Sequence, residues 1–380
     1  MTHASFIDTA REVRDALAEA CHGLVEREVL VDLVALAAVA GEHLLVIGPP
    51  GTAKSEAVRR AARATGASTF EYLLGRFTEP SEIFGPVDLR KLREGLVETE
   101  TRGMLPEAEF AFLDEVFAGS TAILNTLLGI LNERTFRRGH THVSVPLRVC
   151  VGAANALPED ESLAAFADRF LLRAFVDPVP GPRLEELLEG GWALSRRAAG
   201  RTVSLAHLDR LAAVARGADL APARPRIAHG IRLLRAAGIP LSDRRAVRVQ
   251  GLVAAAAALA GREAPTGADL WPMVFAVPTL DGQALARDVL REVLAESENA
   301  TLPAAAEEAS AGPRARAARL VRAGEELLAG RPGDDADGAL ERWRARVEGV
   351  AREIDAGFAP PLPDELAATR ARIVETLGGA

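Results

Sequence analysis

Residues 48–55, GPPGTAKS, have the residue types and the spacing of a loop that binds phosphate. In such a loop Lys54 bridges the β- and γ-phosphates, the Ser55 hydroxyl binds Mg²⁺, and glycines let backbone amides approach the phosphate oxygens. A lysine is needed because its ammonium is a compact charge in a narrow loop, and the only other lysine is Lys91. The segment predicts a nucleotide-binding set formed by Gly48, Gly51, Thr52, Ala53, Lys54, Ser55 and Glu56.

Ala53 is the one residue of the segment that departs from this pattern, because glycine usually occupies the sixth position. Its methyl group removes the freedom that glycine has at positive φ, and this could tilt the amides on either side of Lys54. An accidental Gly/Pro turn is disfavoured because a strand, the glycines, Lys-Ser and a helix all coincide here.

A second group of polar residues, in AFLDE, follows the loop by about 60 residues. Asp114 is predicted to hold the metal and Glu115 to polarise the attacking water. Further along, Asn155 follows another apolar run and is placed to lie between Glu115 and the γ-phosphate. Taken alone, the acidic pair could also be a solvated strand end, and Asn155 a turn residue.

The elements that must position these residues are short strands alternating with helices. Buried strands are predicted at LLVI (44–47), EFAFLDE (109–115) and PLRVCVGAAN (146–155), and a helix at SEAVRRAARAT. This alternation predicts an α/β fold with a parallel sheet that is covered on both faces. Helices dominate from about residue 183, and a first domain boundary is expected near Pro180.

Beyond about residue 300 the chain becomes rich in Ala, Arg and Glu. A seam of apolar residues at spacings of three and four predicts one helix in a bundle of three: Leu340, Trp343, Val347, Val350 and Ile354.

Composition limits the function classes. The 380 residues are 48% hydrophobic and 26% charged, as in an ordinary globular protein, and two cysteines cannot build a disulfide framework. A net charge of -8 argues against a broad nucleic-acid-binding face. No secretion signal and no transmembrane helix are expected, and the cytoplasm is the predicted location.

Six segments taken in order resemble the MoxR family of AAA+ ATPases, and most closely its RavA-like branch: GPPGTAKS, LPEAEFAFLDE, NTLLGILNERTFRRG, GAANALPE, ADRF and SDRR. The resemblance covers roughly residues 20–298. RavA-like proteins also carry Ala in place of the loop glycine, so the resemblance implies that Ala53 is tolerated and that the loop works.

The resemblance implies an AAA+ P-loop NTPase core in residues 1–180, with an N-terminal helix, an α-helical lid in 181–298 and a C-terminal helical domain in 299–380. It also implies ATP and Mg²⁺ as ligands. Family members typically form hexameric rings that act as chaperone-like remodelers.

The same resemblance assigns residue roles. Lys54 and Ser55 fall in the Walker A motif, Asp114 and Glu115 in Walker B, and Asn155 at the sensor 1 position. Arg169 matches the arginine finger offered to a neighbouring subunit, with Arg173 as a rival. Arg244 matches the sensor 2 arginine of the lid, expected to reach the γ-phosphate, with Arg245 as the alternative. Without the family context, a surface ion pair is the favoured explanation of Arg169 and of Arg244.

Two segments occupy the positions of family insertions, namely 85–105 and the hairpin-like TFRRGHTHVSV (135–145). Residues 85–105 contain no Phe, Tyr or Trp, which disfavours a processive unfoldase, because AAA+ unfoldases usually grip polypeptide with an aromatic pore-loop residue. Many MoxR members work with a von Willebrand factor A partner. No D-x-S-x-S run occurs here, so that partner would be a separate chain.

The predicted function is therefore an ATP-hydrolysing ring ATPase that remodels a client protein or assists metal-cofactor insertion. One alternative is a nucleotide-gated assembly scaffold with little turnover, against which the intact Glu115 argues. The other is a nucleic-acid motor, which would need a basic strip built from Arg134, Arg137 and Arg138.

Overall fold

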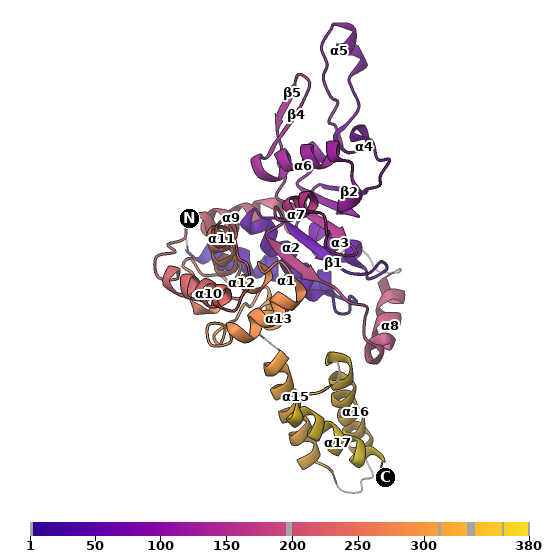
Figure 1. The fold of residues 1–380 in the computed structure, drawn as a ribbon, viewed down its shortest axis with the longest axis vertical. Coiled ribbons are helices and arrows are strands. Elements are labelled where there is room, and N and C mark those ends of the chain that lie inside the picture. Colours follow the sequence, from indigo (N-terminus) through magenta and orange to yellow (C-terminus); the bar gives the residue numbers. More distant parts are fainter. Residues whose placement is uncertain (1–2, 195–199, 311–312, 333–338, 359–360, 379–380) are drawn as a thin grey trace.

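A five-stranded parallel sheet forms the centre of the molecule (Figure 1). The computed structural model describes residues 3–194, 200–310, 313–332, 339–358 and 361–378. The sheet has the order β2-β3-β6-β1-β7 and consists of β1 (Leu44–Ile47), β2 (Thr69–Leu73), β3 (Phe110–Asp114), β6 (Val149–Ala154) and β7 (Leu172–Phe175). The predicted α/β fold with a parallel sheet is confirmed.

Strands β1, β3 and β6 are the three that the sequence predicts, whereas β2 and β7 are not predicted. Only Phe70 of the edge strand β2 is fully buried, so this strand lacks a continuous apolar run. In β7, Arg173 stands between Leu172 and Ala174, and a charged residue in a four-residue strand conceals the pattern.

Parallel strands give the sheet two chemically different edges. We call the edge with the carboxyl ends of the strands the carboxyl edge, and the opposite one the amino edge. Leu44 of β1 pairs with Leu172 of β7 at the amino edge, and Ile47 pairs with Phe175 at the carboxyl edge. Sheets of this type usually bind ligands at the carboxyl edge.

Both faces of the sheet are buried. Leu44 and Val46 of β1 belong to one hydrophobic cluster, whereas Leu45 and Ile47 belong to a second. Successive side chains of a strand point to opposite faces, so the LLVI run reflects burial on both sides.

The helices that flank the sheet and its loops are α1 (His3–Cys21), α2 (Glu28–Ala40), α3 (Lys54–Ala64), α4 (Pro80–Phe84), α5 (Leu89–Arg93), α6 (Thr121–Glu133) and α7 (Glu161–Ala167). Short 3-10 turns are η1 (Leu105–Glu107), η2 (Val116–Ala118), η3 (Gly181–Arg183) and η4 (Gly267–Asp269). Among the described residues, no helix is both long enough and apolar enough to cross a membrane.

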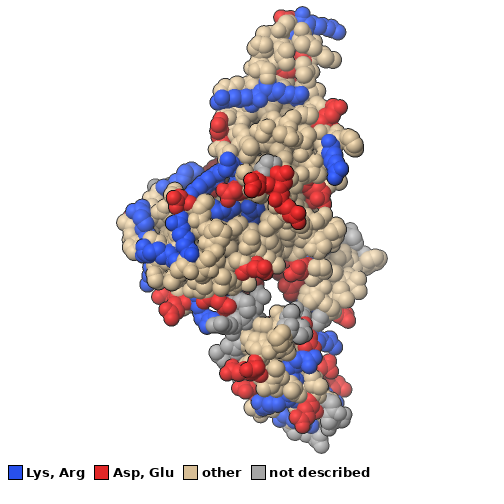
Figure 2. Space-filling view, in the orientation of Figure 1, with Lys and Arg blue, Asp and Glu red and all other residues tan. Residues whose placement is uncertain are grey.

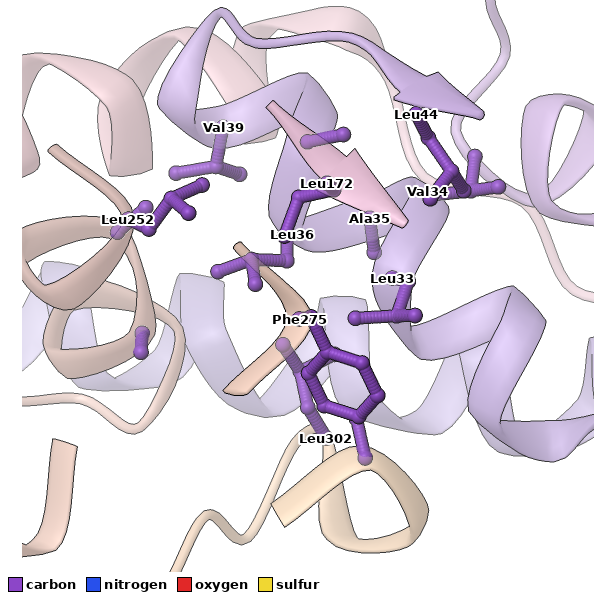
Figure 3. Close-up of a cluster of buried hydrophobic side chains, with 14 of the residues drawn as sticks. Leu33, Val34, Ala35, Leu36, Val39, Leu44, Leu172, Leu252, Phe275 and Leu302 are labelled. Carbon is purple, nitrogen blue, oxygen red and sulfur yellow. The ribbon is translucent and has the colours of Figure 1, made fainter. Parts of the chain in front are cut away.

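A second helical region follows the sheet, with α8 (Leu184–Leu194), α9 (Leu205–Gly217), α10 (Arg224–Ala236), α11 (Asp243–Leu259), α12 (Pro272–Phe275), α13 (Leu280–Val289) and α14 (Pro303–Ser310). Most of it shares one hydrophobic cluster with α1, α2 and one face of the sheet. Figure 3 shows Leu33 and Leu36 of α2 among Leu172 of β7, Leu252 of α11 and Phe275 of α12. Helix α2 therefore packs against the sheet and the helical region together.

Two segments project from one end of the molecule (Figure 1). They are the stretch 85–105, which contains α5, and the hairpin of β4 (Thr135–Arg138) and β5 (Thr141–Ser144). The backbone N–H of His140 donates to the Val97 carbonyl at 2.8 Å, and that of Thr99 donates to Thr141 Oγ1 at 2.8 Å. The two stretches at the family's insertion positions thus lie side by side.

The last helices, α15 (Pro313–Ala329), α16 (Ala339–Gly357) and α17 (Asp364–Gly378), form a bundle at the other end (Figure 1). Trp343, Val347 and Ile354 of the predicted seam are buried in a separate cluster that also contains Leu320 and Ile373. The predicted three-helix packing is confirmed.

A buried carboxylate links α2 to α14. Asp32 lies within α2 with 4% of its surface exposed, and its Oδ2 accepts the backbone N–H of Ala305 in the first turn of α14 at 3.0 Å. Burial raises the pKa of Asp32 to about 7, despite the opposing effect of the Ala304 and Ala305 amides.

The burial of Asp32 makes stability depend on pH. Because the pKa of Asp32 in the folded state lies above the ordinary carboxyl value, the stabilisation from its protonation is complete in acid and is lost as the pH rises through 7. The free energy of unfolding should fall by about 1 kcal/mol from pH 6 to pH 8 through this group. Asp32→Asn keeps an acceptor without the charge, so urea unfolding of this variant should lose that part of the slope. An unchanged pH slope in Asp32→Asn would contradict the assignment.

Candidate nucleotide-binding site

The loop 48–53 connects β1 to α3 at the carboxyl edge of the sheet. The backbone N–H of Gly48 donates to the carbonyl of Ala154, the last residue of β6, at 3.1 Å. A Cβ at Gly48 would lie 2.1 Å from the Val176 carbonyl oxygen, so only glycine fits there. The loop therefore starts from a fixed point and leads into the amino end of α3, where free N–H groups favour anions.

Ala53 adopts the left-handed conformation that normally favours glycine, with φ 56° and ψ 26°. A residue with a Cβ pays about 1 kcal/mol for this conformation. Three contacts hold the loop: Thr52 Oγ1 donates to the Pro49 carbonyl at 2.9 Å, Arg27 Nε donates to the Thr52 carbonyl at 2.6 Å, and the Ala57 N–H donates to the Ala53 carbonyl at 3.1 Å. The methyl group therefore leaves the loop in the backbone conformation that glycine would give it.

Arg27 is a residue of this site that the sequence pattern did not reveal. Its guanidinium is buried, with 4% of the residue exposed, and it bonds the Thr52 carbonyl and, through Nη2, the Asp177 carbonyl at 2.7 Å. Burial lowers the pKa of Arg27. The contact connects the phosphate loop with the segment after β7, which no local spacing in the sequence could indicate.

Lys54 folds back onto the loop. Its Nζ donates to the carbonyl oxygens of Gly48 at 2.6 Å and Pro49 at 2.9 Å. Burial lowers the pKa of this lysine, and the nearby charges of Asp114 and Glu115 act in the opposite direction. The ammonium is thus held inside the loop by neutral acceptors, and its charge remains available to an anion.

The acidic residues and the asparagine reach the same edge from the neighbouring strands. Asp114 ends β3, and its Oδ1 accepts the N–H of Glu115 at 3.0 Å. Asn155 follows β6 and donates through Nδ2 to Glu115 Oε1 at 2.7 Å. Glu115 is also left-handed, at φ 49°, so its side chain is aimed by an unusual backbone and by one side-chain contact.

Ser55 and Glu56 differ in where they can act. Ser55 is half-buried in the first turn of α3, behind Lys54. The Glu56 carboxylate instead pairs with Arg59 at 2.7 Å and with Arg60 at 2.9 Å, both on α3. The Glu56 side chain therefore binds arginines of its own helix and does not point to the phosphates as a ligand.

The oxygen donors at this edge fit Mg²⁺. Asp114 and Ser55 offer a carboxylate and a hydroxyl, and Mg²⁺ beside a nucleotide needs only one or two such ligands with phosphates and waters. The described residues contain no cluster of three or more His, Cys, Asp or Glu suited to a metal, so an all-protein cage is not formed there.

The four candidate arginines lie at the amino edge instead. Arg169 precedes β7, whose first residue, Leu172, donates its N–H to the His43 carbonyl just before β1 at 3.1 Å. Arg245 bonds the carbonyls of Phe170 and Leu171 in the same segment. The length of β1, about 13 Å for four residues, separates this segment from the phosphate loop.

Burial distinguishes the members of each arginine pair. Arg173 is 3% exposed and Arg245 is 2% exposed, so neither reaches the surface. Arg169 and Arg244 are half-buried, and Arg244 Nη2 donates to Asn132 Oδ1 at 2.8 Å. Burial, and then the positive charge of Arg169, lowers the pKa of Arg244, which reflects the proximity of the two guanidinium groups.

The structure thus brings together Lys54, Ser55, Asp114, Glu115 and Asn155 at the carboxyl edge, and Arg169 and Arg244 at the amino edge. It does not bring the two groups together within one chain. Residues beside the second group that the sequence did not reveal are Asp168 and Asn132, which bond Arg245 and Arg244.

Comparisons with known proteins indicate the family to which the chain belongs. A family described as the MoxR domain in the MoxR-vWA-beta-propeller ternary systems matches residues 11–214. Two uncharacterised proteins of Methanocaldococcus jannaschii are each 44% identical over 153 residues, which are 40% of this chain and 41% and 40% of theirs. The chaperone MoxR1 of Mycobacterium tuberculosis is 26% identical over 196 residues, 50% of this chain and 51% of that protein. The chain therefore matches about half or less of the length of these relatives.

A solved structure, that of a putative ATPase from Cytophaga hutchinsonii, superimposes with a TM-score of 0.61 at 16% identity. It covers 78% of this chain and 96% of that one, and at this identity it shows the fold alone. The family match extends over more than half of the 380 residues, from α1 through the sheet and the phosphate loop into α9. The chain therefore belongs to the MoxR family of AAA+ ATPases.

Proposed function

We propose that the protein hydrolyses ATP with Mg²⁺ at sites formed between copies of the chain. The observation that supports this most strongly is the separation of the catalytic groups onto opposite edges of one sheet. A phosphate cradle with a metal ligand and a carboxylate lies at the carboxyl edge, and a pair of partly exposed arginines lies at the amino edge.

Within one chain, the loop amides from Gly48 to Ala53 and the Lys54 ammonium hold the phosphates of ATP. Ser55 and Asp114 hold Mg²⁺, which neutralises charge on the phosphates. Glu115 accepts a hydrogen bond from Asn155 on Oε1, so Oε2 is left to orient and polarise the attacking water.

Charge that develops on the transferring phosphoryl group still needs a cation. Arg169 and Arg244 provide two guanidinium groups, and the charge of Arg169 is one cause that lowers the pKa of Arg244. Since their own phosphate loop lies across the sheet, we assign both to the nucleotide of a neighbouring chain. The burial of Arg173 and Arg245 argues against this role for them.

Such an arrangement requires a head-to-tail oligomer, and a closed ring is the simplest form. We propose a hexamer on the family resemblance, and a RavA-like branch because Ala53 matches the alanine of that branch. The proposed division is an α/β nucleotide-binding domain in 1–180, a lid in 181–298 and a helical domain in 299–380.

We propose that the client is a protein, which is remodelled or assisted in metal-cofactor insertion. The support for this is the similar protein of Mycobacterium tuberculosis, which is named a chaperone. The family description names von Willebrand factor A and β-propeller components, so we propose a separately encoded von Willebrand factor A partner. A cytoplasmic location remains part of the proposal.

The alternatives have less support. A scaffold without turnover has no use for a carboxylate held as Glu115 is. A nucleic-acid motor needs a basic strip, but Arg134 bonds the Gly41 and Leu131 carbonyls and Arg138 bonds the Gly85 carbonyl. On the face shown in Figure 2, basic and acidic side chains are interspersed.

The first test addresses the cradle and the water. Lys54→Ala should abolish nucleotide binding, whereas Glu115→Gln should bind ATP and not cleave it, because Gln cannot polarise water as a carboxylate does. Lys91→Ala changes the only other lysine and is the matched control, with binding and turnover as in wild type. Wild-type turnover in Glu115→Gln would show that another group polarises the water.

The second test uses the strained loop residue. Ala53→Gly should raise the free energy of unfolding by about 0.5–1 kcal/mol, because glycine adopts φ 56° without a clash. Nucleotide affinity, measured by titration with a fluorescent ATP analogue, should change by less than about threefold, or 0.7 kcal/mol. Ala61→Gly, in the right-handed interior of α3, should destabilise instead by about 1 kcal/mol or more. A large gain in affinity for Ala53→Gly would mean that the alanine weakens the cradle.

The third test asks whether the site is completed between chains. Arg169→Ala should lower turnover by about 10³-fold or more while nucleotide binding persists. In a mixture of the two variants, Arg169→Ala subunits supply an intact phosphate loop and Lys54→Ala subunits supply an intact Arg169. About a quarter of the interfaces in a random equal mixture join these two intact parts and should be competent.

The control mixture joins Arg169→Ala with Arg244→Ala. Both variants lack an arginine on the same side of the interface, so little activity should return. Absence of recovery in the first mixture, despite co-assembly, would refute completion between chains.

A further inference from the structure

Two pairs of consecutive residues meet at the amino edge of the sheet. Asp168 and Arg169 are the first two residues after α7, and Arg244 and Arg245 lie in the first turn of α11. The inner members form an ion pair, with Arg245 Nε donating to Asp168 Oδ1 at 2.6 Å. The outer members are the two arginines assigned above to a neighbouring nucleotide.

Arg245 binds the backbone of residues 168–171, the segment that carries Arg169, as well as the Asp168 carboxylate. Its Nη1 donates to the Leu171 carbonyl at 2.8 Å, and its Nη2 to the Phe170 carbonyl at 3.1 Å. A further bond from Nη1 reaches the Ala276 carbonyl at 2.8 Å, just after α12. One planar guanidinium therefore fixes the segment that carries Arg169 to two elements of the helical region.

Asp168 balances two buried cations. Arg173 lies close by, with Nη2 donating to the Ala167 carbonyl at 2.5 Å and with Nε and Nη1 unpartnered among the described residues. Burial, and then the charge of Arg245, lowers the pKa of Arg173 to about 9, and the charge of Asp168 opposes this. Loss of the Asp168 charge would leave Arg173 and Arg245 facing one another in a poorly solvated site, which favours movement of the segment.

The Arg169 guanidinium has little else to hold it. Its Nε is buried without a hydrogen-bond partner among the described residues, and its charge is one cause that lowers the pKa of Arg244. Side-chain contacts of its own thus do not explain a fixed position for Arg169. The ion pair between Arg245 and the preceding residue, Asp168, explains it instead.

We propose that Asp168 and Arg245 are positioning residues that hold Arg169 and Arg244 as one rigid pair of cations, which is offered to the neighbouring chain. This inference rests on the proposed function between chains. It adds that Arg169 and Arg244 act as a unit. The ion pair between Asp168 and Arg245 couples them and itself contacts neither nucleotide nor metal.

The test uses Asp168→Asn in the full-length protein. Asn keeps the size and one acceptor but removes the charge. Turnover in the assembled protein should fall by about 10- to 100-fold, as expected for a misplaced catalytic group. Affinity for a fluorescent ATP analogue should stay within about twofold, because the cradle lies at the other edge of the sheet. Asp168→Glu, which keeps the charge, should recover part of the lost turnover.

Subunit mixing separates positioning from a general loss of folding. Asp168→Asn mixed with Lys54→Ala should regain activity, because the first supplies a sound cradle and the second a sound cation pair. Asp168→Asn mixed with Arg169→Ala should not, since both are defective on the same side.

A matched control is Asp209→Asn, which removes another ion pair between the sheet region and the helical region, Arg148 to Asp209 at 2.7 Å. It should leave turnover unchanged, because this pair holds no part of the arginine segment. An equal loss of turnover in Asp209→Asn would refute the specific role of Asp168.

The outcomes distinguish this inference from the function on which it rests. Normal turnover in Arg169→Ala would overturn the proposed function itself. Normal turnover in Asp168→Asn, with Arg169→Ala inactive, would overturn only the positioning role. An inactive Asp168→Asn that Lys54→Ala cannot restore would show that Asp168 serves the folding of its own chain, and would also overturn the role.

Discussion

The parallel pairing of β1 with β6 on one side and β7 on the other is the constraint on which the rest of the structure depends. It places the phosphate loop beside Asn155 at one edge, and it places the segment of Arg169 at the opposite edge. Antiparallel pairing of β7 would have brought its carboxyl end, and the Asp177 carbonyl that Arg27 binds, away from the loop. The direction of one short strand thus places the phosphate loop and the segment of Arg169 at opposite edges of the sheet.

Backbone strain is concentrated where the chemistry is expected. Four residues other than glycine have positive φ in the described part of the chain, and two of them, Ala53 and Glu115, belong to the carboxyl edge. The surrounding contacts over-determine both: Arg27 and Thr52 hold the loop, and Asn155 holds the carboxylate. Strain that is supported in this way fixes a side chain more firmly than a relaxed turn would.

The sequence predicts best what is local. Lys54, Asp114 and Asn155 each follow an apolar run at a recognisable spacing, so the strands behind them and their common edge could be foreseen. The sequence could not reveal β7, because Arg173 interrupts its apolar pattern, although in the fold that guanidinium is buried. Nor could it reveal Arg27 or Asp168, whose partners lie 150 and 77 residues away. Packing likewise distinguishes Arg244 from Arg245, since one residue of helical rotation leaves the first half-buried and the second buried.

The shared core around α2 has a mechanical consequence. Leu33, Leu36 and Val39 pack in one cluster with strands of the sheet and with α11 and α12, so the helical region and the sheet share one interior, with no boundary at which a hinge could open (Figure 3). Large apolar contacts of this kind suppress motion between regions of a chain. In the proposed oligomer, a nucleotide-driven change of shape would then take place at the interfaces between copies, with each copy rotating as a rigid body.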